Sequence, residues 1–166
     1  MDLTHWAHAV PREVGVILLA MLPVSELRGA IPWAILPQGG GMGLREAYVL
    51  AVLGNFIPVM PLLWGLGPAS NWLRRWRIFD RFFVWLFART RRRGKLVERY
   101  EALGLILFVA IPLPVTGAWT GTVAAFVFGV RFWYAVPAIV AGILIAGVVV
   151  SLACAGVVGV WGLASP

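Results

Sequence analysis

The sequence has few charged residues and almost no cysteine. Only 13% of its 166 residues are charged and one is a cysteine, whereas an ordinary soluble domain carries about 25% charged residues. A lone cysteine excludes a fold held by disulfides, and a hydrophobic content of 61% excludes a disordered chain. A chain this short has too little interior to hide so much apolar surface from water. The composition therefore indicates an integral membrane protein whose main solvent is lipid.

Acidic residues are scarce as well. Seven Asp and Glu stand against fourteen Lys and Arg, which gives a net charge of +7. So basic a chain is often a nucleic-acid binder, but ten of the fourteen cations lie between Arg74 and Arg99. By the positive-inside rule this central segment is cytoplasmic. The sequence thus predicts a multi-pass protein of the cytoplasmic (inner) membrane, with no nucleic-acid partner.

The central segment 70–99 is typical of a basic amphipathic helix. Its aromatic residues fall on one helical stripe with arginines beside it, which suits a helix lying on an anionic leaflet. Each cation near the surface adds roughly 1 kcal/mol of attraction to anionic lipids. The residues expected to bind the lipid surface are Arg74, Arg75, Arg77, Arg91, Arg92 and Arg93.

The two apolar halves on either side of this segment repeat one another. An offset of 88 positions aligns Gly54 with Gly142. In each half a short apolar run is followed by a proline-containing break, a Gly/Ala run, a turn and a long apolar stretch. A second offset, three residues longer, places residues 23–25 (PVS) on residues 114–116 (PVT). Both offsets indicate that the break is duplicated.

The lengths of the apolar runs decide which of them can cross a bilayer, because a spanning helix needs about 20 apolar residues. The runs 44–67 and 132–160 are long enough. The runs before and after each break are too short, and each such pair is predicted to form a re-entrant hairpin, at 14–36 and at 103–128. The alternative joins each pair into one kinked spanning helix, which gives four spans, parallel halves and both termini inside.

The hairpins are favoured because Pro112 and Pro114 remove two amides within three residues, which costs a continuous helix heavily. The predicted fold is an all-α membrane domain of two inverted repeats, 14–67 and 101–163. Each repeat is a re-entrant hairpin followed by a spanning helix, and the cytoplasmic segment 70–99 joins the two. Both termini then lie outside. Two uncovered hairpins also favour a homodimer that shields them.

Each break carries residues that could receive a ligand. Ser25 and Thr116 are placed to cap the helix that follows, so that two helix N-termini would lie inside the membrane. Such termini attract anionic headgroups, and discontinuous helices in paired positions are the best sequence pointer to a transporter site. For Asn55 a structural tie between its span and a hairpin is the simpler interpretation. The other residues assigned to the substrate site are Gly117, Trp119 and Thr120.

Glu26 and Arg28 lie inside the first apolar half, and an ionisable residue at membrane depth is by default a functional candidate. Arg28 could hold a phosphate as a planar fork. Because partial burial disfavours the charged form of a carboxyl group, Glu26 is the predicted proton carrier. Alternatively, the two side chains pair with each other and pin the hairpin tip. Residues i and i+2 point to different faces of a regular helix, so such pairing needs irregular backbone.

The apolar runs hold no set of side chains that supports catalysis, neither a histidine, a cysteine–histidine pair nor paired carboxylates. His5 and His8 stand near the start, but two ligands make a poor metal site. We therefore expect no enzyme activity, no cofactor and no metal.

Two long motifs resemble a known family. Residues 26–32 (ELRGAIP), 54–55 (GN) and 111–121 (IPLPVTGAWTG) resemble the small multi-drug export protein family, and the similarity runs from about Val14 to about Gly156. The family name implies drug export. The layout of hairpin plus span, present twice, is also similar to the DedA, or VTT, superfamily of membrane lipid translocases. That resemblance implies proton-coupled movement of phosphate-bearing lipids such as undecaprenyl phosphate. The break in the second half has no arginine, so the chain departs from a site in which two arginines hold one phosphate.

Three functions follow as hypotheses. The first is transport of an amphiphile with an anionic headgroup, bound by Arg28 and coupled to protons by Glu26. The second is export of cationic amphiphilic drugs by proton antiport, with Glu26 as the partner of the cation. One carboxylate beside an arginine attracts cations weakly, so this hypothesis ranks second. The third is a membrane scaffold that transports nothing.

Overall fold

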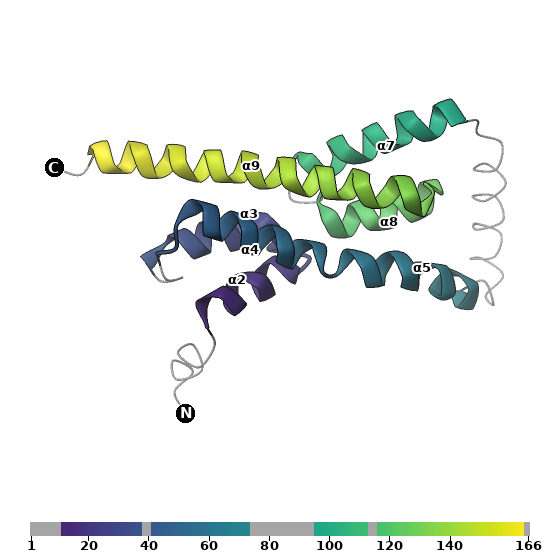
Figure 1. The fold of residues 1–166 in the computed structure, drawn as a ribbon, viewed down its shortest axis with the longest axis horizontal. Helices are drawn as coiled ribbons and strands as arrows, with labels where there is room; N and C mark the ends of the chain where they lie inside the picture. The colour runs from purple at the N-terminus through teal and green to yellow at the C-terminus, as the bar shows by residue number, and fades with distance from the viewer. Residues whose placement is uncertain (1–10, 38–40, 74–94, 113–115, 165–166) are drawn as a thin grey trace. The chain divides into compact units, whose positions relative to one another are not determined.

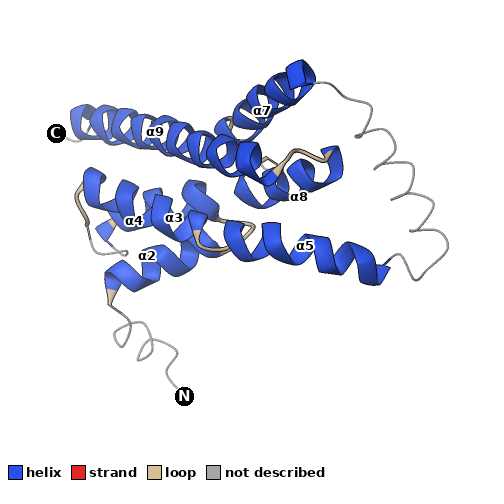
Figure 2. Cartoon of the chain, turned by 45° about the vertical axis from the view of Figure 1, so that its right-hand side comes forward, coloured by secondary structure: helices blue, strands red, loops and turns tan. Residues whose placement is uncertain are grey.

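The computed structural model describes residues 11–37, 41–73, 95–112 and 116–164. The regular elements in these ranges are α-helices (Figure 2), which confirms the predicted all-helical class. The predicted lipid-surface residues Arg74, Arg75, Arg77, Arg91, Arg92 and Arg93 lie outside the described residues. In chain order the helices are α2 (Arg12–Met21), α3 (Glu26–Ile35), α4 (Leu44–Phe56), α5 (Val59–Leu73), α7 (Lys95–Ala110), α8 (Ala118–Phe128) and α9 (Phe132–Ala164) (Figure 1).

Two stretches are long and apolar enough to cross a membrane. They are Leu44–Leu66, formed by α4 and α5, and Phe132–Val157 in α9, as the run lengths in the sequence predict. Only 28% of the apolar window of the first stretch and 44% of the second are buried inside the protein. A helix that served as the core of a soluble protein would be covered on most of its surface. More than half of each window is therefore not buried inside the protein, as is expected of apolar helices in lipid.

The chain divides into two compact units. The first unit contains residues 1–57 and 144–166, and the second contains residues 58–143. The boundaries fall between α4 and α5 and within α9, so each unit combines pieces of both sequence halves. The division of the sequence into repeats 14–67 and 101–163 stays a prediction.

In the first unit, α2, α3 and α4 pack against one another (Figure 1). Glycines make these contacts close. A Cβ atom added to Gly54 of α4 would lie 2.6 Å from the carbonyl oxygen of Ile17 in α2, and one added to Gly15 of α2 would lie 3.1 Å from the Trp33 ring of α3. Small residues at helix crossings let backbones approach closely, as is usual in membranes.

The last part of α9 belongs to the first unit and packs on α4. The hydroxyl group of Tyr48 donates a hydrogen bond to the carbonyl oxygen of Leu144 at 3.2 Å. Gly147 faces the same ring, because an added Cβ atom there would lie 2.6 Å from Cε2 of Tyr48. One tyrosine therefore holds two successive turns of α9.

In the second unit, α8 packs against both α5 and α7. Val109 of α7 contacts Gly121 of α8 and also Gly142 in the first part of α9. A Cβ atom added to Gly142 would lie 2.5 Å from Cβ of Val109 and 3.1 Å from the carbonyl oxygen of Ile106. Two glycines thus bring α8 and α9 close to α7.

Candidate functional site

The first break separates α2 from α3 and occupies residues 22–25. Leu22 leaves the helical conformation (φ −73°, ψ 136°), because the proline that follows disfavours helical geometry in the residue before it. The chain becomes helical again at Glu26, whose backbone N–H donates to the carbonyl oxygen of Leu22 at 3.0 Å. The interruption predicted from Pro23 is therefore present.

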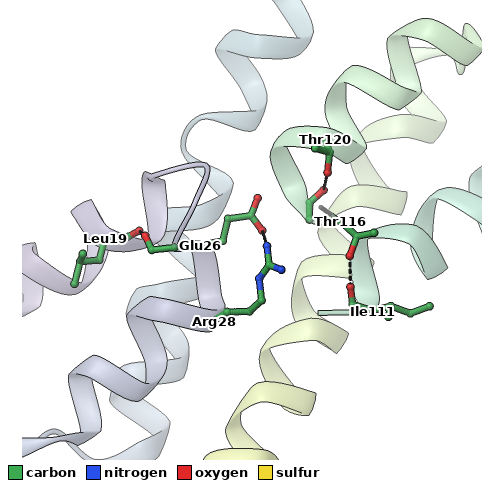
Figure 3. Close-up of polar contacts among 8 residues, drawn as sticks. Leu19, Glu26, Arg28, Ile111, Thr116 and Thr120 are labelled. Atoms are coloured by element: carbon green, nitrogen blue, oxygen red, sulfur yellow. Dashed lines mark hydrogen bonds and ion pairs between the residues drawn. The ribbon is translucent and has the colours of Figure 1, made fainter. Parts of the chain in front are cut away.

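Ser25 stands at the N-cap position of α3, as predicted, but its side chain makes no capping hydrogen bond. Its hydroxyl group donates instead to the carbonyl oxygen of Leu19 in the last turn of α2 (Figure 3). The backbone of Ser25 is helical (φ −85°, ψ −49°), whereas a capping residue is usually extended. The carbonyl oxygen of Leu19 also accepts the backbone N–H of Leu22 at 3.3 Å, so Ser25 adds a second donor at the end of α2, where carbonyl groups run short of intrahelical partners. The prediction that its side chain caps α3 is wrong.

Thr116 at the second break behaves in the same way. Its hydroxyl group donates to the carbonyl oxygen of Ile111 at 2.5 Å, just beyond the end of α7 (Figure 3). The N-cap residue of α8 is Gly117, with φ +155°, a conformation that favours glycine. The Thr120 hydroxyl group reaches the carbonyl oxygen of Gly117 at 3.4 Å. The capping role predicted for Thr116 is therefore also wrong, and both hydroxyl groups bind the end of the preceding helix.

Glu26 and Arg28 form a largely buried ion pair at the start of α3. Glu26 is 5% exposed, and its Oε2 lies 3.7 Å from Nη2 of Arg28 (Figure 3). Among the described non-glycine residues Glu26 is the one with positive φ, at +43°. Residues two apart do not face each other on a regular helix, and this left-handed residue supplies the irregular backbone that the pairing needs.

The backbone of Glu26 is strained. A non-glycine residue in the left-handed region costs roughly 1–2 kcal/mol, and such residues cluster at functional sites, where the surrounding structure holds them. Glu26 is also followed by two residues of the α3 core, Leu27 and Ala30, which are 2% and 0% exposed. The packing of α3 therefore fixes the carboxylate beside Arg28.

Asn55 in α4 is 1% exposed, and its Oδ1 has no hydrogen-bond partner among the described residues. Buried polar atoms nearly always have a partner, so this oxygen is an acceptor in need of a donor. The predicted structural tie between the span and a hairpin does not run through it. The oxygen suits a donor that is not part of the described chain, such as a water molecule or a ligand.

Trp119 and Thr122 in α8 border Pro58, Val59 and Leu62 at the start of α5. The space between these residues has no room for a water molecule. The Thr122 hydroxyl group donates to the carbonyl oxygen of Ala118 at 2.6 Å, so it is satisfied within its own helix. The contact between α8 and the start of α5 is therefore packed, with no room for a ligand between the two helices.

The sequence arguments missed two residues. Glu101 in α7 lines a cavity of about 420 Å³ in the second unit, and its sequence signal was an acidic residue just before an apolar run. Ser151 in α9 is 8% exposed, with an Oγ that has no partner among the described residues. A single serine in an apolar run is common and carries no signal.

Within the described ranges, no group of three His, Cys, Asp or Glu side chains could hold a metal ion.

Two apolar stretches long enough to cross a bilayer, together with helices that pack closely at glycines, are typical of an α-helical integral membrane protein. The chain belongs to the family described as "Putative small multi-drug export protein", whose model matches residues 26–149. The matched range begins at Glu26 and contains the second break. The description names export, which is the activity of a transporter rather than of an enzyme. No curated protein and no solved structure matches the chain.

Proposed function

We propose that the protein is a transporter that moves an amphiphile with an anionic headgroup across the membrane, driven by protons. Arg28 binds the headgroup and Glu26 carries the proton. The observation that carries the proposal is the contact of 3.7 Å between these two buried side chains at a strained break in the first unit. The family description supports transport as the activity, and the anionic substrate is inferred from the site.

The ion pair offers a mechanism for coupling. The ionised carboxylate of Glu26 pairs with the guanidinium group of Arg28, so a headgroup has to displace this carboxylate. Once Glu26 binds a proton, its attraction to Arg28 is lost, while arginine keeps its charge at any physiological pH. A phosphate can then take the place of the carboxylate through paired N–H···O bonds. Anion and proton therefore bind together and leave together.

The cost of isolated charge at membrane depth drives this exchange. An arginine without an anionic partner is expensive inside a bilayer. Only 22% of the Arg28 side chain and 7% of the Glu26 side chain are exposed, so water can solvate neither group fully. Protonation of Glu26 thus favours the binding of another anion at Arg28, and the anion that the membrane supplies is a lipid phosphate.

The hydroxyl groups of the two breaks, one in each unit, could each donate to a headgroup. Those of Ser25 and Thr116 now donate to carbonyl oxygens of Leu19 and Ile111, so binding through them requires an exchange of partners. Asn55 offers an acceptor instead. The roles of Ser25, Thr116, Gly117, Trp119, Thr120 and Asn55 in substrate binding remain part of the proposal.

The proposed substrate is a phosphate-bearing lipid, such as undecaprenyl phosphate or a phospholipid, moved by a DedA-like arrangement. Support comes from helix lengths: α2 and α3 have ten residues each and pack against each other. Ten residues span about 15 Å, half of the hydrocarbon core, as a re-entrant hairpin requires. Inverted halves, a cytoplasmic basic segment in the inner membrane and a homodimer belong to the same proposal.

Reconstitution in liposomes tests the proposal. Translocation of a fluorescent lipid phosphate is measured with and without a pH gradient. Arg28→Ala should slow it at least tenfold, because a charge-assisted hydrogen bond is worth about 1.5–3 kcal/mol. Glu26→Gln should translocate without responding to the gradient. The exposed Arg45 in α4 provides the control, and Arg45→Ala should match the wild type. Wild-type rates and a wild-type response to pH in both site variants would overturn the assignment.

The family description favours a second candidate, the proton-antiport export of cationic amphiphilic drugs. Glu26 is the partner that the sequence suggests for the cation, but Arg28 lies 3.7 Å away and repels it. Drug sensitivity that changes on deletion of the protein and depends on Glu26 would favour this candidate. A scaffold that transports nothing predicts that no lipid phosphate shifts the thermal stability of the purified protein.

A further inference from the structure

Ser25 and Gly29 lie one helical turn apart at the start of α3, and they approach each other closely. A Cβ atom added to Gly29 would lie 2.7 Å from Cβ of Ser25. On a regular helix the Cβ atoms of residues four apart are separated by about 5–6 Å. The first turn of α3 is therefore folded more tightly than a regular helix, and glycine is the residue that fits at position 29.

The left-handed backbone of Glu26 accounts for this close approach. Ser25 itself is helical (φ −85°, ψ −49°), and between Ser25 and Gly29 the residue with positive φ is Glu26, at +43°. This change of hand turns Ser25 over the first turn of α3. It also places the Glu26 carboxylate 3.7 Å from the guanidinium group of Arg28 (Figure 3). The contact at Gly29 and the ion pair are thus two results of one backbone conformation.

Two hydrogen bonds hold Ser25 in this position. Its hydroxyl group donates to the carbonyl oxygen of Leu19 in α2, and its carbonyl oxygen accepts the backbone N–H of Gly29 at 2.8 Å. A Cβ atom is fixed to the backbone and cannot swing aside as the end of a long side chain can. The backbone of Glu26, which is already strained, would therefore have to yield to a methyl group at position 29. A right-handed φ at Glu26 would restore the spacing of a regular helix.

We propose that Gly29 is a positioning residue for the ion pair. Gly29 admits the left-handed conformation of Glu26, and the hydrogen bonds of Ser25 hold it. With a right-handed Glu26 the carboxylate and Arg28 would point to different faces of α3, and the pair would open. What this positioning does for transport rests on the proposed function, in which the pair couples the headgroup to the proton.

A double-mutant cycle between Glu26→Gln and Arg28→Gln measures the ion pair in the purified full chain. Changes in the free energy of unfolding are non-additive for side chains that interact and additive for those that do not. The cycle should be non-additive in the wild type and additive in Gly29→Ala. A glycine with a purely structural role would make the protein less stable and leave the non-additivity of the pair unchanged.

Gly54→Ala in α4 is the matched control. Its added Cβ atom also collides with backbone, at 2.6 Å from the carbonyl oxygen of Ile17, but it meets neither residue of the ion pair. The variant lies in the same unit as the pair. The cycle should therefore stay non-additive in Gly54→Ala even though the protein is destabilised.

A second substitution, at Ser25, identifies the collision itself. Ser25→Gly removes the Cβ atom that the new methyl group of Gly29→Ala would strike, so the two substitutions together should recover at least part of the non-additivity. Ser25→Ala loses the same hydroxyl group but keeps that Cβ atom, so its combination with Gly29→Ala should stay additive. If Gly29→Ala alone does not fold, Ser25→Gly should restore folding and Ser25→Ala should not.

Three outcomes would overturn the proposal: an additive cycle in the wild type, a non-additive cycle in Gly29→Ala, or the same result for the two substitutions of Ser25. Lipid translocation in liposomes separates it from the proposed function. If Gly29→Ala loses the non-additivity of the pair but keeps the wild-type response to a pH gradient, Gly29 positions the pair as proposed, and the pair does not couple transport to protons.

Discussion

Gly54 in α4 lies directly against the carbonyl oxygen of Ile17 in α2. A Cβ atom on Gly54 would stand 2.6 Å from that oxygen and 2.9 Å from Cβ of Ala20. Both distances are shorter than van der Waals contact, so glycine is required for the two backbones to approach this closely. The crossing holds α4 to the helix that precedes the first break.

The second unit contains the corresponding crossing. There Gly142 of α9 lies against Ile106 and Val109 of α7, the helix that precedes the second break. The sequence offset of 88 aligns Gly54 with Gly142, and Ile17 and Ile106 are one position off that alignment. Each unit thus contains the same contact between a spanning helix and a short helix. Duplication of one pair of helices would account for this shared contact. The opposite membrane orientation of the two halves stays a prediction.

The first prediction concerns these glycines. Gly54→Ala should lower the free energy of unfolding by about 1–3 kcal/mol, the cost of an extra group in a packed contact. Gly142→Ala should cost a similar amount, because its added Cβ atom meets Val109 at 2.5 Å. Thermal and denaturant unfolding of the detergent-solubilised protein measures both.

Gly156→Ala in α9 is the matched control, because an added Cβ atom there meets nothing within 4 Å. Replacing a helical glycine by alanine removes a propensity cost of about 1 kcal/mol, so this variant should be as stable as the wild type or more so. If Gly54→Ala unfolds at the same temperature as Gly156→Ala, the close contact with α2 is not a constraint.

The second prediction compares two substitutions of Glu26. Glu26→Gly and Glu26→Ala both remove the carboxylate, but glycine adopts φ +43° without the steric cost that alanine keeps. The glycine variant should therefore be more stable by about 1 kcal/mol. Equal unfolding temperatures would mean that the left-handed backbone at Glu26 stores no strain. Both variants should lose the response of transport to a pH gradient.

The third prediction concerns the hydroxyl groups at the breaks. Ser25→Ala and Thr116→Val leave the carbonyl oxygens of Leu19 and Ile111 without these donors. Each should lower the free energy of unfolding by about 1 kcal/mol. Thr120→Val is the comparison, since its contact with Gly117 is long at 3.4 Å, and its loss should be smaller. An effect at Thr120 as large as at Thr116 would contradict the assignment.

The fourth prediction separates the two roles of Asn55. Its buried Oδ1 has no partner among the described residues, and a buried unsatisfied polar atom costs about 1–3 kcal/mol. Asn55→Leu should therefore unfold at the wild-type temperature or above it, while lipid translocation falls. A large loss of thermal stability in Asn55→Leu would show instead that the amide ties α4 to its neighbours.

The sequence alone predicts the helices and the breaks because both depend on local chemistry. A bilayer demands about 20 apolar residues per span, and the runs that become Leu44–Leu66 and Phe132–Val157 meet that demand. A proline disfavours helix in the residue before it, so the end of α2 before Pro23 can be read from the chain. The sequence also identifies Glu26 and Arg28 as candidate functional residues, since charge in an apolar run is costly.

The partners of the side chains in the site depend on tertiary contacts. The sequence could not show that the Ser25 hydroxyl group turns back to Leu19, because a serine beside two helix ends can serve either one. Nor could it show that φ +43° at Glu26 aims its carboxylate at Arg28. The space beside Gly104, with Glu101 at its edge, arises where α7 and α8 pack. Composition alone indicates that the protein lies in a lipid bilayer. Side-chain partners and cavities depend instead on which atoms come into contact in the folded structure.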